Sequence, residues 1–214
     1  MRAVVFDMDG LMFNTEDIYT LVGRELLRRR GHVFTDELKK EMMGVPPQQA
    51  FAMMIHRLGL HETWQDLAAE SNRLFLEIVD AHIQPMPGLF DLLARLEQAG
   101  IPKAIATSSP KALMDACLDH FNLHARFQFF LTAEDVEQGK PNPEIYLTAA
   151  RRLGIPPAEM VVLEDSQNGC KAAASAGAFT VAIPGAHSLD HDFSTAAIVI
   201  SHLADPRLYE ILRI

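Results

Sequence analysis

Four short apolar stretches of the chain each lead into polar residues that could do chemistry together. The residues that follow these stretches are Asp7, Met8, Asp9 and Gly10, then Thr107, Ser108 and Ser109, then Gly139, Lys140 and Pro141, and finally Glu164, Asp165 and Ser166. Carboxylates, an ammonium group, hydroxyls and turn amides are the groups that neutralise, position and attack a phosphoryl group. They could form a receptor for such a group if the fold brings the four sets to one place.

Two pairs of acidic residues in these sets point to a metal ion. Asp7 and Asp9 would point the same way if the chain stays extended, and Glu164 and Asp165 would add two more carboxylates. Four carboxylates packed together repel one another, and some would take up protons unless a cation neutralised them. Mg²⁺ suits this donor set, because it commonly takes one or two carboxylates, keeps several waters and leaves room for substrate phosphate. Lys140 would add a positive point charge for an anion.

Each of these features also has an ordinary structural explanation. An aspartate at the end of a strand is often a helix cap, and residues 107–110 could cap a following helix. A single lysine in a turn is commonly just solvated. The four sets follow consecutive strands, however, and this repetition favours one shared site over four separate coincidences.

The elements that must position these residues are strands that alternate with helices. The predicted strands are 2–6, 101–106, 127–131, 160–163, 179–183 and 198–200, and the predicted helices between them are 88–99, 110–121, 143–153 and 168–176. Continuous apolar strands joined by helices indicate an α/β fold, a Rossmann-like parallel sheet covered on both faces. Ligands of such sheets bind outside the carboxyl ends of the strands, which is the edge where all four polar sets fall.

One long stretch contains no strand-like run. Four amphipathic helices fit it instead, over residues 15–30, 35–43, 47–58 and 62–82, and the first of them ends in the basic run Arg28–Arg30. We interpret that run as solvated and favourably placed at a helix C-terminus. Helices consecutive over such a length cannot all be crossovers between neighbouring strands, so an inserted all-helical cap is favoured over helices that merely cover the sheet. The predicted domains are a catalytic core, 1–13 with 85–214, and a cap, 14–84.

Composition excludes several classes of protein. The chain has 214 residues, of which 49% are hydrophobic and 22% charged, as in ordinary globular domains. Its net charge of −9 disfavours nucleic acid and anionic membranes as partners. The two cysteines, Cys117 and Cys170, form no disulfide or metal pattern and fit core packing. With neither a signal peptide nor a stretch near the ~18 apolar residues of a membrane span, we expect a cytoplasmic protein. Separately, we expect a monomer whose partner is a small phosphorylated metabolite.

The four sets, in this order, resemble the motifs of the haloacid dehalogenase superfamily. The stretches that carry the resemblance are Val4–Gly10, Ala104–Thr107, Gly139–Pro143 and Val161–Asp165, within residues 1–184. The chain looks most like the branch of sugar-phosphate phosphatases and phosphomutases that carries a small helical cap. Dehalogenating members need no metal and lack the second aspartate of the first motif, so Asp9 favours chemistry at phosphorus.

The resemblance implies a role for each candidate residue. Asp7 would be the nucleophile that forms an aspartyl-phosphate, and Asp9 would be the general acid and base. The implied ligands of Mg²⁺ are the carboxylates of Asp7 and Asp165, the backbone carbonyl of Asp9, and Glu164 either directly or through water. The implied substrate-binding residues are Thr107 and Lys140, which would hold phosphoryl oxygens, and the turn residues Met8 and Ser108. Lys140 would also orient an acidic residue.

The inserted helices decide between hydrolysis and phosphate transfer within one sugar. In the resembling mutases a histidine lies on the first cap helix and an arginine follows a Gly-Val pair. Here Tyr19 stands where the histidine would be, and Gly44–Val45 is followed by Pro46, Pro47 and Gln48. We therefore expect a Mg²⁺-dependent phosphatase of a small phosphomonoester, a phosphorylated sugar. The alternative is a sugar phosphomutase of the beta-phosphoglucomutase type, and a non-catalytic binding role is the third hypothesis.

Overall fold

The computed structural model describes residues 1–42 and 45–214, and the larger part of the chain is built around a parallel sheet. Its strands among the described residues are β1 (Ala3–Phe6), β2 (Lys103–Ala106), β3 (Phe130–Leu131), β4 (Met160–Glu164), β5 (Phe179–Ala182) and β6 (Ile198–Val199), in the order β3-β2-β1-β4-β5-β6. Every neighbouring pair is parallel. The predicted Rossmann-like α/β fold is confirmed.

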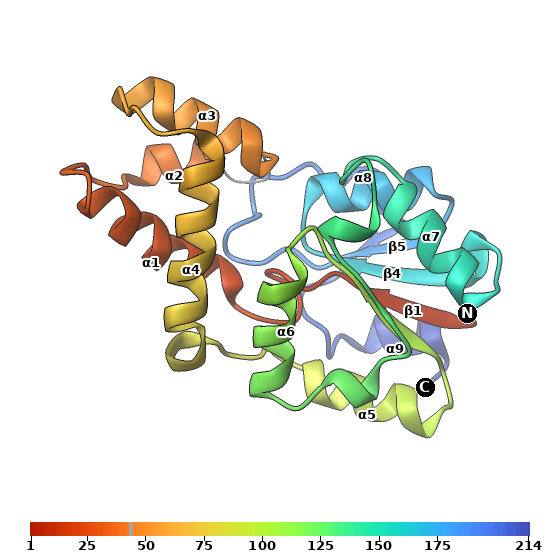
Figure 1. The fold of residues 1–214 in the computed structure, drawn as a ribbon. Helices are drawn as coiled ribbons and strands as arrows, with labels where there is room; N and C mark the ends of the chain where they lie inside the picture. Colours follow the sequence, from red (N-terminus) through yellow and green to blue (C-terminus); the bar gives the residue numbers. More distant parts are fainter. Residues whose placement is uncertain (43–44) are drawn as a thin grey trace. The chain divides into compact units, whose positions relative to one another are not determined.

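Helices cover both faces of this sheet. They are α5 (Leu89–Gln98), α6 (Lys111–His120), α7 (Glu144–Leu153), α8 (Gln167–Ser175) and α9 (Pro206–Leu212). Figure 1 shows α7 and α8 on one face, with α5 and α9 on the other. Because side chains alternate along a strand, Val5, Ala104 and Val162 all point to the α7–α8 face, where they pack with Tyr146 and Ala172.

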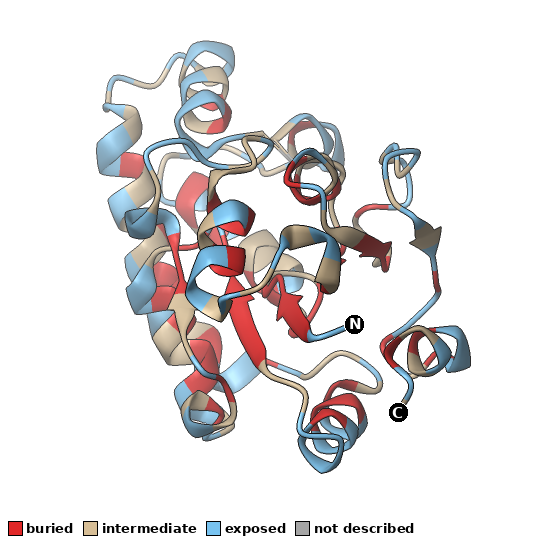
Figure 2. Cartoon of the chain, turned by 90° about the vertical axis from the view of Figure 1, so that its right-hand side faces the viewer, coloured by how far each residue is buried: buried red, intermediate tan, exposed pale blue. Residues whose placement is uncertain are grey.

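The innermost strands consist of mostly apolar residues in unbroken runs, because helices cover both of their faces. β1, β2 and β4 are buried along their whole length. Figure 2 shows buried strands beside helices that turn their exposed sides outward.

Two details at the edges of the sheet differ from the sequence prediction. The strand expected over 127–131 is reduced to Phe130–Leu131, because within the described residues this edge strand pairs with β2 alone, over two residues. Helix α9 was not predicted, although its start carries a clear signal. Asp205 caps the helix by accepting from the backbone N–H of Arg207, and Pro206 occupies the first turn.

Contacts within the chain divide it into two compact units, Met1–Asn14 with Gln84–Ile214, and Thr15–Ile83. The second unit contains α1 (Thr15–Arg28), α2 (Asp36–Met42), α3 (Pro47–Leu58) and α4 (Trp64–His82). The boundaries between the two units fall between residues 14 and 15 and between residues 83 and 84. Asn14 and Gln84, on the first unit's side of these boundaries, pair with each other. Asn14 N–H donates to Gln84 O, and Gln84 N–H donates to Asn14 Oδ1.

Helix α3 has the predicted bounds, whereas α1 ends before its predicted end and α4 begins after its predicted start. Helix α4 starts at Trp64, since Thr63 and Asp66 form a capping box there. Helix α1 ends at Arg28. The expected end of the next helix at Met43, and the Gly44 that follows it, lie outside the described residues. Within the described chain, no helix has the length and apolar character needed to cross a membrane.

The basic run at the end of α1 is paired and not merely solvated, which corrects the sequence interpretation. Arg30 donates to Glu62 Oε1 at 2.8 Å, to Glu70 Oε2 at 2.6 Å and to the Leu26 carbonyl at 2.8 Å. Its side chain is 14% exposed, against 73% for Arg28. Arg30 therefore ties α1 to α4.

Replacing Arg30 by methionine is expected to lower the free energy of unfolding by about 1–2 kcal/mol, because it removes charged hydrogen bonds from a half-buried site. The matched change Arg28→Met, at an exposed pair with Glu25, is expected to cost less than about 0.5 kcal/mol. Urea unfolding followed by circular dichroism measures both. Equal effects of the two variants would contradict the structural role given to Arg30.

Candidate active site

The strand order brings the four polar sets to one edge of the sheet. Since β1 lies between β2 and β4, the residues beyond their carboxyl ends become neighbours. The groups placed there are Asp7 after β1, Thr107 after β2, Lys140 in the loop after β3, and Glu164 with Asp165 at the end of β4. The sheet bonding continues past the strand end, because Asp7 N–H donates to Leu163 O at 2.9 Å. Asp7 therefore has a fixed backbone.

Lys140 is the cation at the centre of this group. Its ammonium donates to Asp7 Oδ1 at 2.6 Å, to Glu164 Oε1 at 2.7 Å and to the Ala106 carbonyl at 2.9 Å. Only 6% of its side chain is exposed. Burial alone would lower the pKa of Lys140, but the carboxylates of Asp7 and Glu164 raise it well above its usual value. Lys140 therefore stays charged.

Glu164 is held on both of its oxygens. Oε1 accepts from Lys140 Nζ and from the hydroxyl of Tyr146, at 2.7 and 2.5 Å. Oε2 accepts from the N–H and the hydroxyl of Ser166, at 3.3 and 3.0 Å. The carboxylate also lies against Gly169 in α8, where a Cβ atom would come within 1.8 Å of Oε1. Glu164 is fully buried and its carboxylate is fixed in place.

Among the described residues, hydrogen bonds hold Asp9 on one of its two oxygens. Its Oδ2 accepts from the hydroxyls of Thr107 and Ser109, at 2.9 and 2.8 Å, and Ser109 N–H donates to Thr107 Oγ1 at 3.0 Å. Its Oδ1 is buried and has no hydrogen-bond partner among the residues that the structure describes. Such a group is rare and calls for a chemical explanation.

Three buried carboxylates form a group that could hold a metal ion. Asp7, Glu164 and Asp165 each offer an oxygen, and these atoms lie within 4.8 Å of one another. Burial raises the pKa of Asp7 well above its usual value, Lys140 offsets part of this effect, and the charges of Glu164 and Asp9 raise it further. A hard divalent cation with oxygen ligands would relieve this repulsion, so the donor set fits Mg²⁺.

The remaining predicted residues lie at the same edge of the sheet. The side chain of Met8 is fully buried, so only its backbone is suited to meet a ligand. Ser108 is exposed, between the buried Thr107 and Ser109. The possibility that residues 107–110 only cap a helix does not hold, because α6 has no side-chain cap and Ser109 uses its hydroxyl on Asp9.

Two residues that shape the site were given no individual role in the sequence analysis, although Ser109 belongs to the second polar set. Ser109 lies two positions after Thr107, a spacing that could have identified it as a second donor to the same acceptor. Tyr146 lies on the buried face of α7, and an aromatic residue at such a position normally indicates core packing. Its contact with Glu164 depends on packing between α7 and β4, which a single sequence does not reveal.

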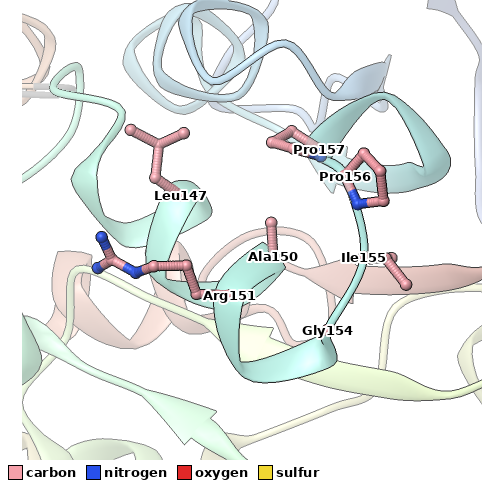
Figure 3. A pocket seen from close by; sticks show the side chains of 7 residues that line it. All are labelled: Leu147, Ala150, Arg151, Gly154, Ile155, Pro156 and Pro157. Atoms are coloured by element: carbon pink, nitrogen blue, oxygen red, sulfur yellow. The ribbon is translucent and has the colours of Figure 1, made fainter.

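A groove elsewhere on the first unit is separate from this site. It has a volume of about 480 Å³ and is lined by Leu147, Ala150, Arg151, Gly154, Ile155, Pro156 and Pro157. Figure 3 shows these side chains around the end of α7 and the loop that leads to β4. The groove therefore lies near the amino end of β4, whereas Glu164 is at its carboxyl end.

Comparison with known proteins identifies the family. A family model described as haloacid dehalogenase-like hydrolase matches residues 4–183. The chain is 34% identical over 207 residues to "Probable pseudouridine-5'-phosphatase" of Drosophila melanogaster, covering 94% of this chain and 89% of that protein. It is 33% identical over 181 residues to "Phosphorylated carbohydrates phosphatase" of Thermotoga maritima, covering 83% and 82%. The crystal structure of CbbY from Rhodobacter sphaeroides in complex with phosphate has a TM-score of 0.85 at 26% identity, over 96% of both chains.

These matches confirm the predicted superfamily and the predicted enzyme class, a phosphoric monoester hydrolase. The chain belongs to the haloacid dehalogenase-like hydrolase family.

Proposed function

We propose that the protein is a Mg²⁺-dependent phosphatase that hydrolyses a small phosphomonoester, a phosphorylated sugar, through an aspartyl-phosphate on Asp7. The observation that carries this proposal is the contact of 2.6 Å between Lys140 Nζ and Asp7 Oδ1, beside the carboxylates of Glu164 and Asp165. An attacking carboxylate and a phosphate dianion repel each other, so the nucleophile needs positive charge next to it. Lys140 supplies one such charge.

The reaction would run in two steps. First, an oxygen of Asp7 attacks phosphorus, the bond from phosphorus to the ester oxygen breaks, and Asp9 gives a proton to the leaving alkoxide. Then Asp9 takes a proton from a water molecule whose oxygen attacks the aspartyl-phosphate, which releases phosphate and regenerates Asp7. The hydrogen bonding of Asp9 supports this role, because Thr107 and Ser109 fix Oδ2. We assign the transferred proton to Oδ1.

Mg²⁺ bound here would supply further positive charge to offset the repulsion between nucleophile and phosphate. Its proposed ligands are the carboxylates of Asp7 and Asp165 and the backbone carbonyl of Asp9. Glu164 would contribute directly or through water, and the four donors already on its oxygens favour the second arrangement. The proposed phosphoryl-binding groups are Thr107, Lys140 and the backbone amides near Met8 and Ser108.

The substrate class rests on the helical unit and on the relatives. We propose that Thr15–Ile83, which is compact in its own right, is the cap that selects the substrate. One relative is named for phosphorylated carbohydrates, which supports a sugar phosphate. Tyr19, at the position of the mutase histidine, packs its ring on Phe75 with centroids 4.9 Å apart. An aromatic packing role at this position favours hydrolysis over the mutase reaction.

Removal of the metal tests the proposal. The protein is expected to hydrolyse p-nitrophenyl phosphate in Mg²⁺, with the rate falling at least about a hundredfold in EDTA and recovering when Mg²⁺ is restored, since charge neutralisation at phosphorus would be lost. Phosphate release and nitrophenol absorbance give the rates. Equal rates in EDTA and Mg²⁺ would contradict the metal's role.

The mutase alternative is tested with glucose 1-phosphate and a priming sugar bisphosphate. A phosphatase releases inorganic phosphate, whereas formation of glucose 6-phosphate without phosphate release would favour the mutase. A screen of phosphorylated metabolites by phosphate release would then identify the substrate.

A further inference from the structure

Tyr146 contacts two residues of the site without being part of the phosphoryl receptor itself. It lies on α7, is fully buried, and donates its hydroxyl hydrogen to Glu164 Oε1 at 2.5 Å. The Lys140 ammonium lies 5.1 Å from the centroid of its ring. A phenol buried only for packing would satisfy its hydroxyl on any nearby acceptor. This one is bonded to the carboxylate that also holds Lys140.

The contacts form a chain from α7 to the nucleophile. The Tyr146 hydroxyl and Lys140 Nζ share Glu164 Oε1, and Lys140 Nζ in turn bonds Asp7 Oδ1. On the other side, Ser166 holds Glu164 Oε2. A carboxylate with donors on both oxygens cannot rotate freely, so the ammonium bound to it has a fixed place. Charge held in place before the reaction stabilises a transition state more than charge that must reorganise.

We propose that Tyr146 is a positioning residue, whose hydroxyl fixes Glu164 so that Glu164 holds the Lys140 ammonium against Asp7. The inference rests on the proposed function, since it concerns the charge that Lys140 places beside the attacking carboxylate. Tyr146→Phe keeps the ring beside Lys140 and removes only the donor. Glu164 Oε1 then has Lys140 as its remaining hydrogen-bond donor within the described residues, and both side chains gain freedom to move away from Asp7.

Steady-state kinetics with p-nitrophenyl phosphate in saturating Mg²⁺ test this chain of contacts. Tyr146→Phe is expected to lower kcat by about ten- to hundredfold, the range for losing a hydrogen bond to a charged group, with KM changed less than about twofold. The matched control is Tyr209→Phe on α9, where a tyrosine ring also lies under a cation, the Arg95 guanidinium at 4.5 Å. The control variant is expected to keep wild-type kcat.

A binding measurement separates positioning from a merely structural role. Vanadate mimics the transition state, and its affinity can be measured by calorimetry with Mg²⁺ present. Tyr146→Phe is expected to lower the affinity for vanadate by the same factor as kcat, while the affinity for inorganic phosphate stays unchanged. A variant that melts at a lower temperature but keeps wild-type kcat and vanadate affinity would overturn the inference. So would a lower kcat with unchanged vanadate affinity.

A second variant keeps the inference testable if Tyr146→Phe does not fold. Ser166→Ala removes a donor from the other oxygen of the same carboxylate, and the same selective loss of kcat and vanadate affinity is expected. The backbone N–H of Ser166 still donates to Oε2 in this variant, so the loss is expected to be smaller than for Tyr146→Phe. Full kcat together with full vanadate affinity would contradict the inference that the side-chain donors on Glu164 position Lys140. Wild-type protein that is inactive on every phosphomonoester would instead overturn the proposed function, so the two failures are distinguishable.

Discussion

Asp7→Asn is expected to lower kcat by about ten-thousandfold or more, because an amide oxygen cannot attack phosphorus as a carboxylate does. The protein is expected to remain folded. Asparagine has the same shape and can still accept from Lys140 at the position of Oδ1. Burial raises the pKa of Asp7, so the folded state favours the neutral form, and the amide removes a costly charge above that pKa.

Phosphate release and thermal unfolding in EDTA measure the two effects of Asp7→Asn. The melting temperature is expected to equal or exceed that of the wild type. Asp91→Asn, the same change at an exposed position on α5, should leave both activity and stability unchanged. Residual activity of Asp7→Asn within about tenfold of the wild type would exclude Asp7 as the nucleophile.

Lys140→Met is expected to be the most destabilising change at the site. It leaves the buried carboxylates of Asp7 and Glu164 without the cation that both contact, and breaking a buried pair costs about 3–5 kcal/mol. The loss should shrink as the pH falls, because burial raises the pKa of Asp7 and protonation of Asp7 removes an unpaired charge. Activity should fall by about a thousandfold, because charge beside the nucleophile is lost.

Lys103→Met is the matched control for this variant. Both lysine side chains are 6% exposed, but Lys103 pairs with Glu97, which is 41% exposed and also bonded to Arg126. Water and Arg126 can satisfy Glu97, so the expected loss is about 1 kcal/mol or less. Urea unfolding in EDTA over a range of pH compares the two variants. Equal losses that do not depend on pH would contradict the charge network.

The strands and the four polar sets could be predicted because their signals are local. An apolar run that ends abruptly in Asp7 or Glu164 marks both a buried strand and the edge where it stops. Parallel topology then determines which strand ends meet, and this holds for Asp7, Lys140 and Glu164.

Local sequence signals could not predict interactions between elements that lie far apart in the sequence. Arg30 binds Glu70 on α4 and Glu62 in the segment just before that helix, so its sequence pattern alone was typical of a solvated run. Tyr146 has the apolar spacing of a core position, and only the packing of α7 on the sheet reveals its bond to Glu164. The orientation of Asp9 likewise depends on Ser109, which reaches it across the sheet edge from the end of β2.

The central claim is that Asp7 becomes phosphorylated during turnover, and rapid-quench mass spectrometry tests it most directly. The enzyme is mixed with excess phosphomonoester and Mg²⁺, quenched in acid within the first turnovers, and digested with pepsin at low pH. The expected result is one added phosphoryl group on the peptide that contains Asp7, which hydroxylamine removes and which is absent from Asp7→Asn. Rapid phosphate release with this peptide unmodified at every quench time, or with the group on another residue, would contradict the account.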